Sequence, residues 1–127
     1  MEQSLVRDAF LDPVYLDFRD EIASVLDPRT HDIDWLDREI WAGRVQIWGN
    51  NRACVLTEVR HFPTGAFEIH VLVGAGSAEI MVSQIMPEIL NWKDEIGALF
   101  VTVSSRPAWV RLLKPLGFEV WQTEVRC

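Results

Sequence analysis

The stretch Ala98–Val120, ALFVTVSSRPAWVRLLKPLGFEV, decides the fold. Its first part, 99–103, carries apolar residues on both alternating faces, which is typical of a strand covered on both sides. Ser104 or Ser105 can cap the helix that follows, and Gly117 can end it. A last strand is expected after the glycine. The apolar positions of the helix share one face: Trp109, Leu112, Leu113 and Leu116.

Composition and charge exclude several classes of protein. The chain has 127 residues, and we expect one domain over 1–127 with a sizeable core. A formal charge of −7 argues against a nucleic-acid partner. No apolar run has membrane-spanning length, and the first residues do not resemble a signal peptide, so we expect no membrane contact and a cytoplasmic protein. Cys54 and Cys127 lack metal-ligand spacing, which predicts reduced thiols and no metal site.

Two amphipathic helices are predicted in the N-terminal part. The first opens at Asp12-Pro13 and ends before Asp27-Pro28, because the residue before a proline avoids the helical region. The second is capped by Thr30 or Asp32 and ends at Gly43. Trp35 is expected to cover a seam between the two helices. Their apolar stripes are Val14, Phe18, Ile22, Val25 and Leu26 in the first, and Ile33, Leu36, Ile40 and Trp41 in the second.

From residue 45 the apolar period changes to two. Val45–Trp48 and Ala53–Val59 predict an antiparallel hairpin, and Ala66–Val73 predicts a third strand. Gly74-Ala75-Gly76 should break that strand before a long helix over 77–96, which Pro87 should kink or divide. A right-handed crossover would then set the strand at 99–103 parallel to the third one. The expected fold is mixed α/β (α+β), mainly antiparallel with a central parallel pair and helices on both faces.

Four short pieces of the sequence resemble a known family. They are the run Gly43–Trp48, the helix containing Trp92, the run Arg106–Trp109, and the pair Gly117-Phe118. Together with the order of elements, they resemble the GNAT-type N-acetyltransferase fold, and the likeness is closest to small GNAT-like proteins encoded by phages and prophages. It covers about Ala42 to Val125. The resemblance implies the fold more strongly than the activity.

The resemblance also implies a place for acetyl-CoA. In active members the pantetheine pairs with the backbone at the end of the first parallel strand, which corresponds here to Leu72, Val73 and Gly74. The pyrophosphate lies at the following helix N-terminus, which would involve Gly76, Ser77 and Ala78. The family loop, Gln/Arg-x-x-Gly-x-Gly/Ala, is shortened here and lacks its Gln or Arg. A glycine turn that only makes a strand-to-helix corner is the alternative interpretation.

The family's general acid is not visible, whereas a base can be proposed. The family's Tyr and Asn positions are occupied here by Leu113 and Arg106. Acyl transfer to an amine needs a group that removes a proton near neutral pH. Glu68 and His70 share one face of the third strand, and Glu58 lies on the neighbouring strand, so each is a candidate base. Alternatively, the three form a cross-strand polar cluster.

Two functions remain open from the sequence. One is a CoA-dependent N-acyltransferase, an acetyltransferase acting on an unknown amine. The other is a non-catalytic, GNAT-like binding or virion-associated phage protein with a protein partner, acting as a homodimer or larger homo-oligomer. Trp48, Trp109 and Trp121 are too many for one small core, so an exposed subset would mark an oligomer interface.

Overall fold

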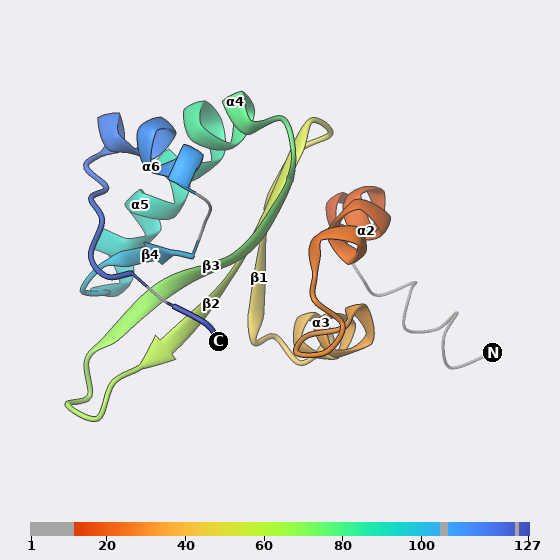
Figure 1. Cartoon of the computed structure of the whole chain (residues 1–127), viewed down its shortest axis with the longest axis horizontal. Coiled ribbons are helices and arrows are strands. Elements are labelled where there is room, and N and C mark those ends of the chain that lie inside the picture. The colour runs from red at the N-terminus through yellow and green to blue at the C-terminus, as the bar shows by residue number, and fades with distance from the viewer. Residues whose placement is uncertain (1–11, 105–106, 124) are drawn as a thin grey trace.

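The computed structural model describes residues 12–104, 107–123 and 125–127. A twisted sheet separates two groups of helices, as Figure 1 shows: α2 and α3 lie on one face, and α4, α5 and α6 on the other. The mixed α/β fold expected from the sequence is therefore confirmed. Among the described residues, no helix is long and apolar enough to cross a membrane.

The two N-terminal helices form where their caps predict. α2 spans Pro13–Val25, and the Asp12 carboxylate accepts a hydrogen bond from the Val14 N–H at 2.7 Å. α3 spans Ile33–Trp41, and of the two expected caps Asp32 is the one used, accepting from the Trp35 N–H at 2.8 Å. These bonds satisfy amide donors that have no partner inside the helix.

The stripe predicted for α2 is wrong at Val25. Val25 is 62% exposed, whereas Tyr15, which the stripe omitted, is fully buried. The reason is a polar contact between the helices. The Tyr15 hydroxyl donates to Asp37 Oδ1 at 2.6 Å, and Arg19 donates to both oxygens of the same carboxylate, at 3.1 and 2.6 Å. Because Asp37 is itself 0% exposed, these bonds fix α2 against α3.

The described sheet has the order β1-β2-β3-β4. β1 (Val45–Gly49), β2 (Ala53–His61) and β3 (Phe67–Gly76) pair antiparallel in sequence. β4 (Val101–Val103) pairs parallel with β3, as the predicted crossover requires.

The expected break at Gly74 is wrong, because β3 continues to Gly76 and pairs there with Ala53. A Cβ on Gly74 would lie 2.8 Å from the sulfur of Met81. A Cβ on Gly76 would lie 2.5 Å from the Arg52 carbonyl oxygen, and its φ of +92° is one that L side chains rarely adopt. Both glycines therefore allow the chain to pack closely against itself, which is what the corner interpretation proposed.

The long crossover helix is divided, as Pro87 predicts. α4 (Ala78–Ile80) leads into a π-helical turn, η1 (Met81–Ile85), and then into α5 (Met86–Ile96). Pro87 lies in the first turn of α5 and has no N–H to donate to the preceding turn, so the hydrogen-bond pattern widens before it. Gly97 then ends α5 in the left-handed conformation.

The C-terminal unit differs most from its prediction. β4 is shorter than expected and lies at the edge of the described sheet, so Leu99 and Phe100 are 55% and 40% exposed. α6 (Pro107–Leu113) and the 3₁₀ turn η2 (Lys114–Leu116) follow, with Leu113 buried but Leu112 exposed. No strand forms in 117–123 or 125–127. Ser105 and Arg106 lie outside the described residues.

Candidate active site

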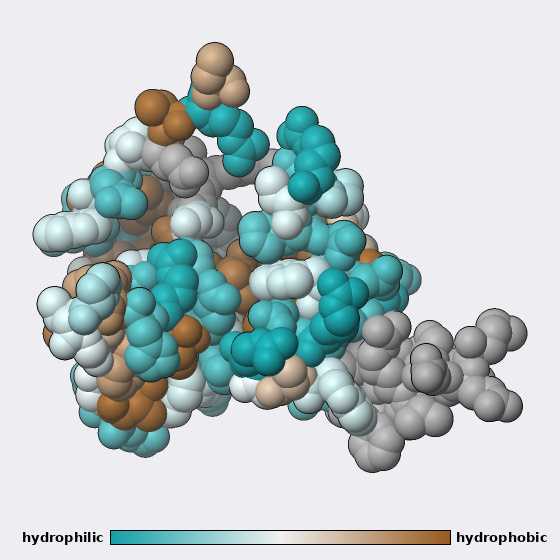
Figure 2. All heavy atoms as spheres, turned by 90° about the horizontal axis from the view of Figure 1, so that it is seen from below, coloured by the Kyte–Doolittle hydropathy of each residue, from teal (hydrophilic) through white to brown (hydrophobic). Residues whose placement is uncertain are grey.

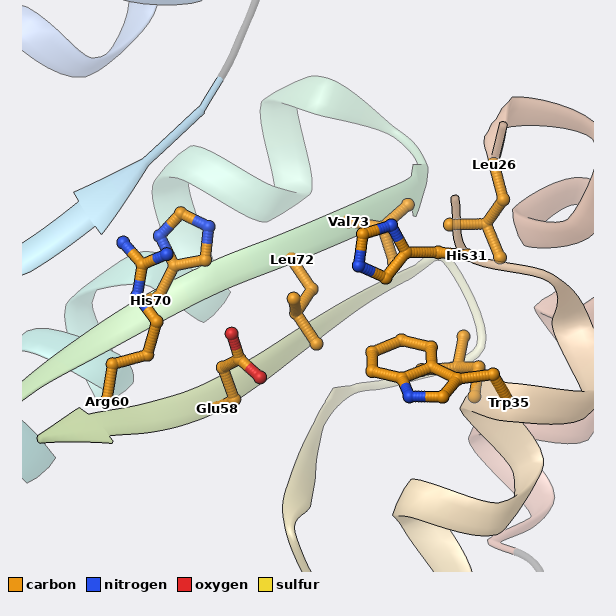
Figure 3. A pocket seen from close by; sticks show the side chains of 9 residues that line it. Leu26, His31, Trp35, Glu58, Arg60, His70, Leu72 and Val73 are labelled. Atoms are coloured by element: carbon orange, nitrogen blue, oxygen red, sulfur yellow. The ribbon is translucent and has the colours of Figure 1, made fainter. Parts of the chain in front are cut away.

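A cavity of about 230 Å³ opens on the face of the sheet that α2 and α3 cover only in part. One end is polar and the other apolar, as Figure 3 shows. Side chains from β2 and β3 form its floor, and the α2–α3 connection and α3 form its wall. The lining residues are Leu26, His31, Trp35, Leu36, Glu58, Arg60, His70, Leu72 and Val73.

A β-bulge shapes the floor of this cavity. Leu56 pairs with Val73 and Thr57 with Val71, so the register between β2 and β3 skips Leu72. The extra residue shifts the alternation by one position. Leu72 and Val73 are neighbours in β3, and because of this shift both side chains line the cavity.

The polar end consists of two cross-strand pairs. Glu58 is opposite His70, and Arg60 is opposite Glu68. Arg60 donates to Glu68 Oε1 from Nε at 2.9 Å and from Nη2 at 2.7 Å. The Glu68 side chain is only 5% exposed and is absent from the cavity lining. This geometry is that of a structural ion pair, so Glu68 is the weakest of the three candidate bases.

His70 lies between the cavity and β4. Its Nδ1 is 2.8 Å from the hydroxyl oxygen of Thr102, the residue opposite it on β4. Burial, with the positive charge of Arg60 as a second cause, lowers the pKa of His70 to about 4. The ring is therefore uncharged at neutral pH, and its contact with Thr102 holds its orientation.

Glu58 is the carboxylate that faces the cavity. Burial raises the pKa of its carboxyl group, Glu39 and Glu68 raise it further, and Arg60 and His31 act in the opposite direction. A half-buried carboxylate with a raised pKa binds a proton more readily than one in water. Of the three predicted residues, Glu58 therefore has the environment best suited to a base.

The apolar end was largely missed by sequence reasoning. Trp35 covers it from α3, and His31 packs against this indole with ring centroids 4.9 Å apart at 71°. A tryptophan that fits no helical stripe was the available signal for this wall. Arg60 was also missed, although its spacing of two from Glu58 places both side chains on one face of β2.

The backbone predicted to hold the pantetheine is available on β3. The ladder between β3 and β4 ends at the pair Val71 and Val103, five residues before β3 itself ends at Gly76. The main chain of Leu72, Val73 and Gly74 therefore has no β4 partner in the described structure. This stretch fits an extended ligand that adds its own hydrogen bonds to a strand edge.

The corner predicted to hold the pyrophosphate has other partners for two of its three residues. Gly76 belongs to the ladder with Ala53, and the Ser77 N–H donates to the Arg52 carbonyl at 3.0 Å. The Ser77 hydroxyl accepts from the Ile80 N–H at 3.2 Å. Ala78, the first residue of α4, is left as the donor, and the acidic Glu79 follows it. The corner therefore fits a diphosphate less well than the strand fits the pantetheine.

Other reactive groups of the chain are remote from this chemistry. Tyr15 is fully buried, and its hydroxyl donates a hydrogen bond to Asp37. Burial and this hydrogen bond both raise the pKa of the hydroxyl. Cys54 is fully buried, and burial raises the pKa of its thiol to about 12, so it is a small core residue. In the described part of the chain, no group of three or more His, Cys, Asp and Glu residues could hold a metal ion.

Comparison with known proteins identifies the fold. No protein-family model and no curated protein matches the sequence. Among solved structures, an acetyltransferase of Trypanosoma brucei has a TM-score of 0.63 at 8% identity, covering 89% of each chain. A predicted acetyltransferase from Clostridium acetobutylicum, solved with acetyl-CoA, has a TM-score of 0.57 at 15% identity, covering 90% of this chain and 86% of that one.

A third similar structure carries a different description. A transcriptional regulator from Bacillus halodurans has a TM-score of 0.61 at 8% identity and covers 92% of this chain and 95% of that one. All three identities are low, so these likenesses concern the fold. The chain has the GNAT-type acetyltransferase fold, as the sequence resemblance implied.

Proposed function

We propose that the protein is a CoA-dependent N-acyltransferase that transfers an acetyl group to a small amine. The observation that carries the proposal is the position of Glu58: a half-buried carboxylate with a raised pKa faces the cavity. The stretch of β3 that has no β4 partner in the described structure adjoins it, since Leu72 and Val73 also line that cavity. Glu58 would bind the ammonium form of the acceptor and then remove its proton.

The surrounding residues prepare this step. Bound acetyl-CoA would supply the thioester carbonyl that the neutral amine attacks; the carbon–nitrogen bond would form, the carbon–sulfur bond would break, and CoA would leave as its thiolate. Leu72, Val73 and Gly74 would hold the cofactor through their backbone, with the Ala78 N–H at its diphosphate. His70 is a positioning residue: uncharged and tied to Thr102, it borders Glu58 without competing for the proton. The Arg60–Glu68 pair would keep the end of the cavity polar without adding net charge.

Cofactor binding is the first prediction. A ligand at about 100 times its Kd stabilises a folded protein by about 2.7 kcal/mol, which raises the Tm of a domain this size by about 5 °C or more. We expect acetyl-CoA to produce such a rise in differential scanning fluorimetry, and calorimetry to give one site per chain. Dephospho-CoA, which lacks the 3′-phosphate, is the control that shows whether this phosphate contributes to the shift in Tm. No shift at millimolar acetyl-CoA would contradict the proposed function.

A second candidate function, a homodimeric binding module, is favoured by the surface around β4. Val120, Trp121 and Val125 are 63%, 79% and 89% exposed on a C-terminal segment rich in strand-forming residues. The outer edge of β4 has no partner among the described strands. Figure 2 shows hydrophobic side chains on the left of the view from below. We infer that the C-terminal segment of a second copy covers this edge, reciprocally.

Mass in solution tests this interface. Light scattering should give about twice the 14.6 kDa of one chain, and Trp121→Ser should return the mass to that of one chain. Trp41→Ser is the matched control, since Trp41 is 53% exposed on α3, across the sheet. A wild-type monomer at 100 µM, roughly the concentration at which weak dimers form, would contradict the inference. The relation to phage proteins and the cytoplasmic location stay predictions.

A further inference from the structure

We propose that the acceptor is a compact primary amine with an apolar or aromatic body and no acidic group. This inference rests on the proposed function, because it concerns the occupant of the same cavity. It goes further in stating what the cavity selects. Three observations lead to it: the charges at the polar end, the side chains at the other end, and the size of the space between them.

The charge at the polar end favours a cation. Arg60 is the one arginine or lysine in the lining, and both its Nε and its Nη2 already donate to Glu68 Oε1. The Glu68 carboxylate already balances the charge of this guanidinium, so an acceptor carboxylate or phosphate gains less from the remaining N–H donors. It would also lie close to Glu58, whose charge would repel it. An ammonium group is instead attracted by Glu58, and it can bind while the Arg60–Glu68 ion pair stays intact.

The opposite end favours a hydrocarbon or aromatic body. Leu26, Leu72 and Val73 surround it together with Trp35, whose indole forms the wall on the α3 side (Figure 3). A ring or alkyl chain of the acceptor would bury apolar surface against them. Polar peptide groups in the same place would lose hydrogen bonds to water. A lysine side chain of a protein is therefore disfavoured, because its flexible four-carbon stem is followed by peptide groups, which would be placed at this apolar end.

The size of the space agrees with a small acceptor. A cavity of about 230 Å³ holds about eight waters at ~30 Å³ each. That is below the roughly 300–1,000 Å³ typical of sites for drug-sized ligands. An amine with one ring and a two-carbon stem carries a cation for the polar end and an apolar body for the other end. Phenethylamine meets all three requirements.

Four ligands of matched shape test the inference by isothermal titration calorimetry. Phenethylamine is compared with phenylalanine, which adds a carboxylate; with 2-phenylethanol, which removes the charge; and with Nα-acetyl-lysine methylamide, which presents a lysine. Each titration is run without and with saturating CoA. We expect phenethylamine to bind at least tenfold more tightly than the other three. Equal or tighter binding of any of them, or no binding of phenethylamine in either condition, overturns the inference.

Variants assign the contacts. Glu58→Gln should weaken phenethylamine at least tenfold and leave 2-phenylethanol unchanged, whereas Trp35→Leu should weaken both. Glu88→Gln is the matched control, because Glu88 is exposed on α5, on the other face of the sheet. A Glu58→Gln protein that keeps its affinity for the amine contradicts the proposed contact. Binding of phenethylamine without formation of its acetamide from acetyl-CoA would uphold this inference and refute the proposed function.

Discussion

Replacing Glu58 with glutamine should lower kcat for acetyl transfer by about 10²–10⁴-fold, the usual contribution of a general base. The amide keeps the size of the side chain but cannot take a proton from the amine. The affinity for acetyl-CoA should be unchanged, since the backbone of β3 is its expected contact. Steady-state kinetics with a small amine, together with calorimetry of the cofactor, separate the two quantities.

The pH profile gives the same prediction a second readout. A base acts in its deprotonated form, so kcat/KM of the wild type should rise with pH through the pKa of Glu58. Burial raises that pKa, so the limb should lie above the range of an ordinary glutamate. His70, with a pKa of about 4, is already neutral there and contributes no such limb. Glu58→Gln should lack the limb.

The controls identify which carboxylate acts. Glu88→Gln on α5 should leave turnover unchanged. Glu68→Gln should have a smaller effect than Glu58→Gln, because Glu68 is bound to Arg60 and does not line the cavity. Wild-type turnover in Glu58→Gln would remove Glu58 as the base. A larger loss in Glu68→Gln would transfer the role to Glu68.

The second large effect is expected on stability. Asp37→Ala should lower the free energy of unfolding by about 3–5 kcal/mol, the cost of removing one partner of a buried ion pair. Asp37 is fully buried, and it accepts hydrogen bonds from Tyr15 and Arg19. Without it, the Tyr15 hydroxyl is left in the core facing a void. Urea unfolding followed by circular dichroism measures the difference.

A surface pair of the same residue types provides the comparison. Arg29 and Asp27 are 2.8 Å apart, but the Arg29 side chain is 81% exposed. Arg29→Ala should therefore lower the free energy of unfolding far less than Asp37→Ala does. If Asp37→Ala is as mild as Arg29→Ala, the buried network does not hold α2 to α3. Should Asp37→Ala fail to fold, Tyr15→Phe, which removes one bond, provides a measurable smaller loss.

The deciding stretch shows how local signals succeed and where they fail. Gly97 and Gly117 end helical turns as the sequence predicts, since a left-handed residue is a local requirement. The apolar run 99–103 correctly predicted a strand parallel to β3 but wrongly predicted cover on both sides. Exposure depends on what lies beside a strand, and β4 has one neighbour in the described sheet. The strand expected after Gly117 does not form in the described residues 117–123 and 125–127 for the same reason: a strand forms only with a partner.

The candidate site divides in the same way. The period of two sufficed to place Glu68 and His70 on one face of β3, because alternation follows from backbone geometry, whereas the β2–β3 register brought Glu58 to the same face. Their different chemical characters came from tertiary contacts. The β2–β3 register places Arg60 opposite Glu68, where the two form an ion pair, and the Thr102 hydroxyl on β4 contacts the His70 ring. Trp35, from a helix, closes the cavity in which Glu58 is partly removed from water.

The amino-acid sequence therefore determined the order of the elements, the helix caps and the set of ionisable groups on one face of the sheet. Each depends on residues close together in the chain. The tertiary structure decided that Glu68 is paired with Arg60, that the His70 ring is uncharged, and that Glu58 faces a cavity with a raised pKa. Desolvation and ion pairing depend on the distances between elements that the sequence alone does not specify, and a single bulge at Leu72 is enough to change which side chains face the site.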